Sequence, residues 1–404
     1  MAVVAPMDAS YVPKVLHSLT DEDEAWRKYA TNDEACVLVI YTGGTIGMVK
    51  DKDGVLKPAP GILDKRLREF PQLHDAEYAK EHFGDCEKPP LVVPVTGDPR
   101  RVIYTISEYD PLLDSSNATM DDWLQVAKDI KKYYDSYQGF IVLHGTDTMA
   151  YTSSALSFLL ENLGKSVIPV FEPRSDGRDN LLNALIIAGN YVVPEVTLMF
   201  HHQLFRGNRV SKFSISHLDA FASFNMAPLI TIGINVDSEG RNFVPHDKLN
   251  RDVGLLRLFP SITAELVEAF LKPPVEGVVL QTYGAGNAPT ARKDIMEALR
   301  SATERGVLVV NCSQCLHGAV DPAYETGNEL VQVGVIPGGD MTPEAALTKL
   351  AYVLSKSEWT LDEKKKKLQE NLRGELTTGP SDAGWADQYK TLNLMGPWKA
   401  LFIR

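Results

Sequence analysis

Cysteine is scarce in this chain. Its 404 residues include four cysteines, too few to cross-link a protein of this length by disulfides. We therefore expect reduced thiols and a cytoplasmic location. Cys312 and Cys315 have the spacing of half a zinc site or of a redox pair, but no second pair of ligands stands at a suitable distance. The sequence favours two structural thiols.

Long apolar runs and an excess of basic charge are also missing. No stretch of about 18 uninterrupted apolar residues is present, and no basic run followed by an apolar segment opens the sequence. The 41 basic and 53 acidic side chains give a formal net charge of −12, which repels nucleic-acid phosphates and acidic membrane surfaces. We therefore expect a folded, soluble protein that binds neither membrane nor nucleic acid.

What the sequence does contain is apolar runs that alternate with helical patterns. Residues 36–41 and 140–143 are continuous β-rich runs, as expected of strands buried on both faces of a parallel sheet, and residues 166–171 form a third run. Leucines at helical spacing, up to Leu163, follow the second run, with Gly164 as the expected C-cap. Strands that alternate with helices predict βαβ units and the α/β fold class.

Three polar segments are candidates for chemistry because ligands of open α/β sheets bind outside the carboxyl ends of parallel strands. They are residues 42–47 (TGGTIG), 145–148 (GTDT) and 113–117 (LDSSN). The first has the glycines of a phosphate loop but lacks the spacing and the lysine of one, so we expect Thr45 to be an exposed hydroxyl. Taken singly, the second is more typical of a helix cap and the third of a turn.

A hydroxyl nucleophile requires a base, and the residues alone leave its identity open. His144 adjoins the second segment, but a histidine at the end of a buried strand more often has a backbone partner. A lysine whose pKa is lowered by burial is the alternative, and sequence does not show which lysine is buried.

Taken together, the motifs TGGTIG at residues 42–47 and HGTDTM at residues 144–149 resemble the two signature motifs of the L-asparaginase family. The chain is similar to the cytosolic, type I branch that includes the animal enzymes. The likeness continues through residues 113–117 (LDSSN), 174–182 (RSDGRDNLL), 203–212 (QLFRGNRVSK), 282–289 (TYGAGNAP) and 311–320.

This resemblance implies hydrolysis of L-asparagine to L-aspartate and ammonia without a metal or an organic cofactor. Thr45 would be the nucleophile that forms an acyl-enzyme ester. Thr146, Asp147 and Lys212 match the second catalytic group of the family, in which the lysine is the base. Tyr324 matches a tyrosine that serves in animal members.

The resemblance also implies how the substrate is held. Asp147 would bind the α-ammonium group, and Asp114, Ser115 and Ser116 match the pocket for the α-carboxylate. Gly44, beside the nucleophile, belongs to the same expected site. Asn287 matches a residue supplied by a neighbouring subunit, so a homo-oligomer, dimer or tetramer, is expected.

Changes of pattern along the chain, together with the resemblance, predict the domain organisation. The acidic N-terminus is expected to be an extension with a possible short helix around Trp26, and a charged segment rich in turn formers is expected to be a linker. The fold class is then α/β, with a larger N-terminal Rossmann/flavodoxin-like sheet domain joined by a linker to a smaller C-terminal α/β domain. The predicted parts are the extension (1–34), the N-terminal domain (35–236), the linker (237–251), the C-terminal domain (252–376) and a tail (377–404).

One departure from the family pattern keeps two other functions open. Members of the family carry a Thr-Gly-Ala/Ser-Gln-Ile segment between the positions of Ile168 and Pro169, and this chain lacks it. In the family that segment completes a strand and lines the pocket. The alternatives are a catalytically impaired, asparaginase-like binding protein and a glutaminase or lysophospholipid esterase on the same scaffold.

Overall fold

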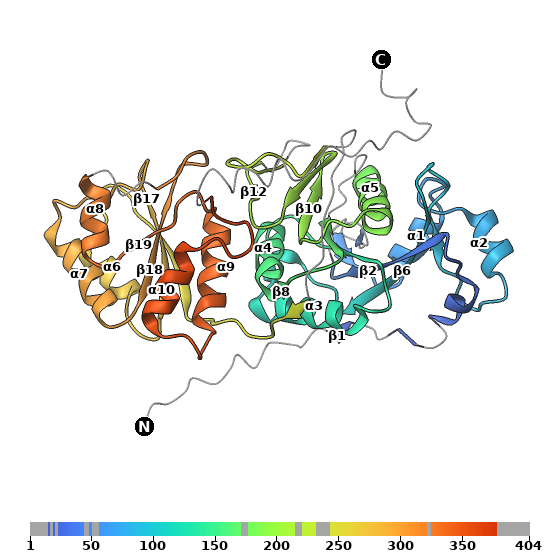
Figure 1. The fold of residues 1–404 in the computed structure, drawn as a ribbon, viewed down its shortest axis with the longest axis horizontal. Helices are drawn as coiled ribbons and strands as arrows, with labels where there is room; N and C mark the ends of the chain where they lie inside the picture. Colours follow the sequence, from blue (N-terminus) through green and yellow to red (C-terminus); the bar gives the residue numbers. More distant parts are fainter. Residues whose placement is uncertain are drawn as a thin grey trace, which may run out of the picture.

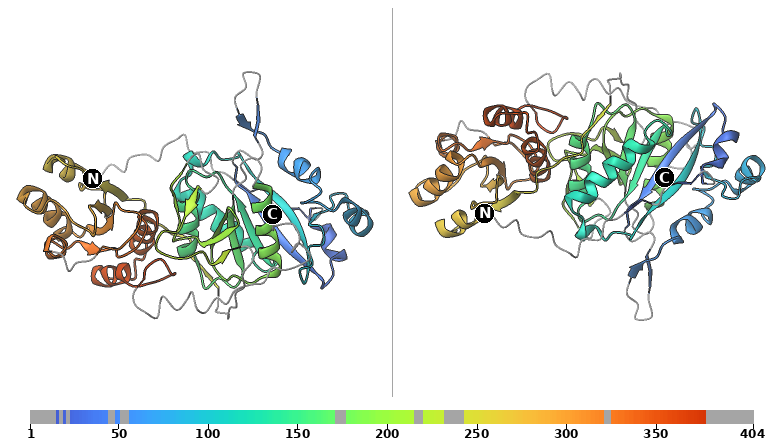
Figure 2. Two further views of the ribbon diagram at one scale, coloured as in Figure 1. Left: turned by 90° about the horizontal axis from the view of Figure 1, so that it is seen from above. Right: turned by 90° about the horizontal axis from the view of Figure 1, so that it is seen from below.

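The computed structural model places a larger, N-terminal domain beside a smaller, C-terminal one, and the two lie side by side along the long axis in every view (Figures 1 and 2). None of the described helices is long and apolar enough to cross a bilayer. The described residues are 15–16, 19–20, 23–43, 48–50, 56–170, 177–214, 220–231, 243–320 and 325–377.

The larger domain is built around a mainly parallel sheet with the strand order β1-β6-β2-β7-β9-β10-β11-β14 and with β5 beside β6. Strands β6, β2, β7, β9 and β10 run parallel. Taken in chain order, they follow the flavodoxin-like arrangement, whose switch point lies between the first and third strands, here β2 and β7. The predicted fold class is confirmed. The strands are β1 (Val15–Leu16), β2 (Glu34–Tyr41), β5 (Leu91–Val92), β6 (Arg101–Asp110), β7 (Gly139–Leu143), β9 (Ser166–Val170), β10 (Thr197–Phe200), β11 (Gln203–Arg206) and β14 (Ile230–Thr231).

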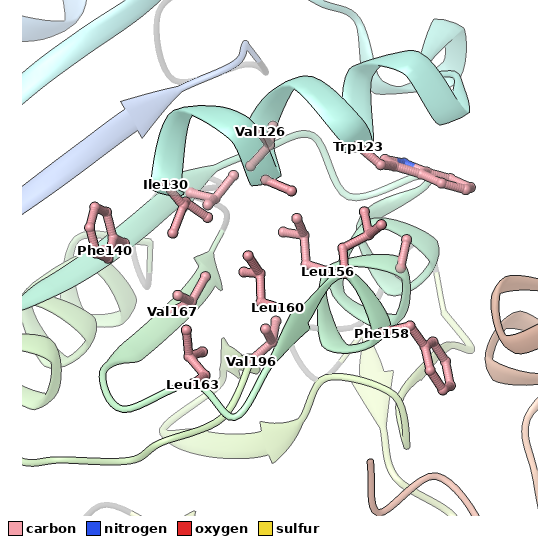
Figure 3. Packing of buried hydrophobic residues seen from close by; sticks show 14 of the residues in the cluster. Trp123, Val126, Ile130, Phe140, Leu156, Phe158, Leu160, Leu163, Val167 and Val196 are labelled. Carbon is pink, nitrogen blue, oxygen red and sulfur yellow. The ribbon is translucent and has the colours of Figure 1, made fainter. Parts of the chain in front are cut away.

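Helices cover both faces of this sheet, which explains why the central strands are continuously apolar. Helix α5 (Gly177–Asn190) packs in one hydrophobic cluster, and α3 (Met120–Tyr133) and α4 (Met149–Leu159) pack in another. In Figure 3, Val126 and Ile130 of α3 point toward Leu156 of α4. Each fully buried side chain of this size stabilises the fold by about 1.5–3 kcal/mol.

The smaller domain contains the parallel sheet β16-β17-β18-β19, again with helices on both faces. Thr342 caps α9 by accepting a hydrogen bond from the Ala345 N–H, with Pro343 in the first turn. Helix α9 packs against α4 of the larger domain, where the rings of Phe158 and Tyr352 stack 5.8 Å apart. The elements are β16 (Val253–Arg257), α6 (Ala264–Phe270), β17 (Gly277–Thr282), α7 (Lys293–Glu304), β18 (Leu308–Ser313), α8 (Glu325–Gln332), β19 (Ile336–Pro337), α9 (Pro343–Leu354) and α10 (Leu361–Gln369).

The remaining elements are short. Trp26, in the 3-10 helix η1, is fully buried against Phe83, so the predicted N-terminal extension contributes to the core. These elements are η1 (Ala25–Tyr29), β3 (Met48–Lys50), β4 (Leu56–Pro58), α1 (Ile62–Arg68), α2 (Ala76–Phe83), η3 (Ser115–Asn117), β8 (Leu160–Glu161), β12 (Ser211–Lys212), β13 (Phe221–Ala222) and β15 (Val244–Pro245).

The helix expected to run to Leu163 ends earlier. Helix α4 stops at Leu159, and β8 then pairs with β15, which lies in the segment predicted to be a linker. Leu163 is still buried, because the chain reaches the same hydrophobic cluster without continuing the helix. Gly164 is therefore not the C-cap of α4.

Candidate active site

The ends of the central strands are joined at the switch point of the larger sheet. The Thr42 N–H, directly after β2, donates to the Leu143 carbonyl at the end of β7, with the two atoms 3.0 Å apart. The Leu113 N–H, in the segment after β6, donates to the Thr42 carbonyl at 2.7 Å. Gly43 has φ +142°, and a Cβ added there would lie 2.0 Å from the Leu113 carbonyl oxygen, so only glycine fits. The described parts of the three predicted segments thus meet at one place.

A lysine reaches this place from a distant part of the chain. The Lys212 Nζ donates to the Thr146 Oγ1 at 2.9 Å and to the Asp147 Oδ1 at 2.7 Å. The Lys212 side chain is 19% exposed and that of Asp147 is 62% exposed, so one member of the pair faces solvent. The amine lies within hydrogen-bond reach of a hydroxyl, the geometry that proton transfer requires.

The segment after β6 packs against the segment after β7. The Thr148 hydroxyl donates to the Ser115 carbonyl at 2.7 Å, and a Cβ added at Gly145 would lie 2.4 Å from the Ser115 Oγ. Asp114 caps η3 by accepting from the Ser116 N–H at 3.0 Å. Asp114 and Ser116 are exposed beside the Thr146 loop, whereas Ser115 is buried.

His144 is occupied by structural partners, as the residues predicted. Its Nδ1 lies 2.7 Å from the Gly145 carbonyl oxygen and its Nε2 lies 3.1 Å from the Thr152 hydroxyl. Burial lowers the pKa of the His144 imidazole and keeps it neutral. The ring therefore holds the strand end in place, and the side chain that lies beside the Thr146 hydroxyl is Lys212.

Comparison with protein families agrees with this arrangement. Residues 36–243 match the family described as "Asparaginase, N-terminal", and residues 252–367 match the "Glutaminase/Asparaginase C-terminal domain". The chain belongs to the asparaginase family.

Similar proteins of this family are found in animals and bacteria. The chain is 52% identical to the L-asparaginase of Dirofilaria immitis over 366 residues, which cover 87% of this chain and 62% of that protein. It is 46% identical to the 60 kDa lysophospholipase of Mus musculus over 368 residues, which cover 87% of this chain and 64% of that protein. It thus spans less than two thirds of the length of these animal relatives.

Bacterial members match along nearly their whole length. The chain is 44% identical over 356 residues to L-asparaginase 1 of Escherichia coli K12, covering 84% of this chain and 98% of that protein. Among solved structures, L-asparaginase I from Vibrio cholerae superposes with a TM-score of 0.72 at 42% identity, covering 85% of this chain and all of the other.

The asparaginase resemblance predicted four further residues for this site. Gly44, Thr45 and Tyr324 lie outside the described residues. Asn287 lies in the turn after β17 of the smaller domain, where its N–H donates to the Tyr283 carbonyl at 2.8 Å.

The segment that differs from the asparaginase pattern lies next to the HGTDTM motif. Strand β9 stays paired with β7 through Pro169 and Val170, although proline has no N–H to donate. The Val170 carbonyl accepts from the His144 N–H at 3.2 Å. The sheet therefore reaches the motif despite the missing residues.

Among the described residues, no group of three or more histidine, cysteine or acidic side chains is placed to hold a metal ion. Burial raises the pKa of the Cys312 thiol to about 12, as expected of a structural thiol. Cys315 is exposed, so the prediction of two structural thiols is wrong for this residue, which the turn after β18 places at the surface.

Sequence reasoning missed two buried cations that stand close to Lys212 in the sequence. Arg206 and Arg209 are both 5% exposed, although they stand in the same short segment as Lys212. The sequence did offer one signal, a cluster of basic residues next to an apolar strand in an acidic chain. Because buried cations require partners, such a cluster indicates ion pairs inside the protein.

Proposed function

We propose that this chain hydrolyses L-asparagine to L-aspartate and ammonia. The observation that carries the proposal is the Lys212 amine, 2.9 Å from the Thr146 hydroxyl and 2.7 Å from the Asp147 carboxylate. The group lies at the switch point of the sheet, where ligands of such folds bind. The names of the relatives in nematode and bacteria support the same reaction.

The substrate is a small zwitterion, so each charged end needs a partner. The Asp147 Oδ1 contacts Lys212, and the 62% exposed side chain leaves room for the α-ammonium group. The exposed Ser116 hydroxyl and the neighbouring backbone N–H groups suit the α-carboxylate, with Asp114 and Ser115 shaping that turn. The side-chain carboxamide then faces the threonines.

Two stages complete the proposed reaction. In the first stage, the Lys212 amine acts as base and takes the proton of a threonine hydroxyl, whose oxygen bonds to the carboxamide carbon while backbone N–H groups stabilise the oxyanion. Thr45 is the proposed nucleophile, with Gly44 beside it and Tyr324 assisting. The carbon–nitrogen bond breaks, the proton leaves with ammonia, and an ester remains. Water, activated through Thr146 and Lys212, then releases aspartate and restores the threonine.

Assembly, location and domain limits belong to the same proposal. Asn287 is proposed to complete the site of a neighbouring subunit in a homodimer or homotetramer, which sedimentation would measure. A cytoplasmic location agrees with four cysteines that are free thiols. The proposed domains are residues 35–236 and 252–376, with 237–251 between them.

An ammonia-release assay with L-asparagine tests the proposal. We expect release by the wild-type chain and none by Thr45→Ala. If the wild-type chain releases no ammonia at millimolar L-asparagine, the proposed function is rejected. Binding of aspartate in a calorimeter without turnover would instead identify an impaired relative, and insertion of Thr-Gly-Ala-Gln-Ile after Ile168 would then restore activity.

An acyl hydrolase of broader specificity is the second candidate. It is favoured by the similarity to 60 kDa lysophospholipases of mouse and human, at 46% and 47% identity. The same assay with L-glutamine, and fatty-acid release from lysophosphatidylcholine, separate the candidates. One extra methylene in glutamine changes discrimination by about 1–3 kcal/mol, so both amides must be compared as kcat/KM.

A further inference from the structure

The segment that carries Lys212 is tied to the C-terminal part of the chain. The Ser211 hydroxyl donates to the Glu344 Oε2 at 3.0 Å, and the Arg209 Nη1 donates to the Asp340 Oδ2 at 2.8 Å. The Arg209 Nε also donates to the Gly374 carbonyl at 2.6 Å. Side chains next to Lys212 thus contact the smaller domain and the segment that follows α10.

This segment has little regular structure of its own. Strand β12 consists of Ser211 and Lys212, which pair with Ala222 and Phe221 of β13. A lysine on so short a strand does not hold its position by strand pairing alone. The position of the Lys212 backbone, and with it the origin of the side chain, therefore depends on the tertiary contacts of the neighbouring residues.

The partner of Ser211 stands on a firmly packed helix. Glu344 lies in the first turn of α9, and one turn later the Thr348 hydroxyl lies 2.8 Å from the Ser154 hydroxyl of α4. Helix α4 begins at Met149, two residues after Asp147. Figure 1 shows β12 at the border of the two domains, near α4 and α9. Thr146 and Asp147 thus lie just before helix α4, and the hydrogen-bond partner of Ser211 lies on helix α9.

The electrostatics of the anchors favour fixed contacts. Burial alone would raise the pKa of Asp340, but the Arg209 guanidinium and hydrogen bonds from Thr377 hold it below its usual range. Burial raises the pKa of Glu344, whose carboxylate accepts the Ser211 hydrogen bond. Hydrogen bonds to partly buried charged groups are worth more than those at the surface.

We propose that Glu344 and Arg209 are positioning residues that hold Ser211 and its neighbours so that the Lys212 amine stays within bonding distance of the Thr146 hydroxyl. The inference rests on the proposed function, in which Lys212 is the base. A displacement of about 1 Å at a reacting group costs on the order of a hundredfold in rate. Through these contacts the smaller domain sets the rate of a reaction that takes place in the larger one.

Replacement of Glu344 tests the proposal. Glu344→Leu removes the acceptor while keeping the size of the side chain, and Glu344→Gln keeps an acceptor oxygen. We expect kcat for L-asparagine, normalised to the folded fraction, to fall about tenfold in Glu344→Leu and less than about twofold in Glu344→Gln. KM should stay within about twofold in both, because Asp147 and the segment after β6 hold the substrate.

Thr348→Val is the matched control. It removes the hydrogen bond between Thr348 and Ser154 and the one from Thr348 to the Glu344 backbone carbonyl, but it leaves the Glu344 side chain on Ser211, so kcat should be unchanged. Ser211→Ala removes the other partner of the Glu344 contact with minimal change of volume, and it replaces Glu344→Leu if that variant does not fold. The expected loss of kcat in Ser211→Ala is about fivefold to tenfold.

The outcomes separate the two proposals. If wild-type protein is active and both Glu344→Leu and Ser211→Ala keep wild-type kcat, the positioning role is rejected while the proposed function stands. A loss in Thr348→Val equal to that in Glu344→Leu also overturns the positioning role. Wild-type protein without activity overturns both proposals.

Discussion

Two lysine–carboxylate ion pairs in this molecule have the same distance between nitrogen and oxygen but different surroundings. In the larger domain, the Lys212 and Asp147 atoms lie 2.7 Å apart and their side chains are 19% and 62% exposed. In the C-terminal part, Lys349 and Glu375 also lie 2.7 Å apart, but both are fully buried. The buried lysine makes further hydrogen bonds to the carbonyls of Leu368 and Glu370.

The two pairs differ in exposure and not in distance, so we expect exposure to separate a reactive pair from a structural one. The carboxylate of Asp147 is open to solvent, and the Lys212 amine has the Thr146 hydroxyl as a second neighbour. The pair of Lys349 and Glu375 has its partners inside the protein, where removal of one charge leaves the other without solvation. The first pair is therefore expected to control activity and the second stability.

Removal of Lys212, the lysine of the partly exposed pair, should have the largest effect. Lys212→Met is expected to lower kcat for L-asparagine by about 10²- to 10⁴-fold, the usual contribution of general acid–base catalysis. The free energy of unfolding should change by less than about 1 kcal/mol, because exposed ion pairs contribute little. Ammonia release and urea unfolding measure the two quantities. Lys366→Met, at a 79% exposed lysine of α10, is the control and should change neither.

Removal of the buried cation should act on stability. Lys349→Met is expected to lower the free energy of unfolding by about 3–5 kcal/mol, because the Glu375 carboxylate is left buried without its partner. The double variant Lys349→Met/Glu375→Leu should recover part of the loss. Urea unfolding of the single and double variants gives the answer, and a single variant as stable as wild type contradicts a structural role for the pair.

A smaller effect is expected from the exposed carboxylate. Asp147→Asn should raise KM for L-asparagine by about 10- to 100-fold, since a charge-assisted hydrogen bond is worth roughly 1.5–3 kcal/mol. Asp362→Asn, at a 94% exposed carboxylate of α10, is the control. Steady-state kinetics checks this result. If kcat falls while KM is unchanged, Asp147 positions Lys212 and does not bind the substrate.

The smallest effect concerns acid stability. Burial alone would raise the pKa of Glu375, but the Lys349 ammonium and backbone N–H groups lower it from its usual value of 4.5. A carboxyl with a lowered pKa stabilises the fold above pH 4.5 and loses this contribution as the pH falls through the lower value.

Acid unfolding followed by circular dichroism measures that contribution. Wild-type protein should lose stability more steeply below pH 4.5 than the double variant Lys349→Met/Glu375→Leu, which lacks the titrating carboxyl. Equal slopes for the two proteins would show that Glu375 does not titrate with folding.

Parts of the fold and of the candidate site were predictable from the sequence, and other parts were not. The apolar runs before Thr42 and His144 are strands β2 and β7, since such runs are stable only when both faces are covered. The leucine spacing up to Leu163 wrongly predicted that the helix continues to this residue. Burial of an apolar side chain is favourable whether or not the backbone is helical. The base among many lysines was chosen only through the family resemblance.

By itself, the sequence determined the parallel strands and the polar motifs at their ends, because both depend on residues that are close together along the chain. Tertiary structure alone decided that Lys212 meets Thr146, 66 residues earlier, and that Glu344 reaches back 133 residues to Ser211. Contacts over such separations depend on how distant elements of the chain pack together, which no local pattern specifies.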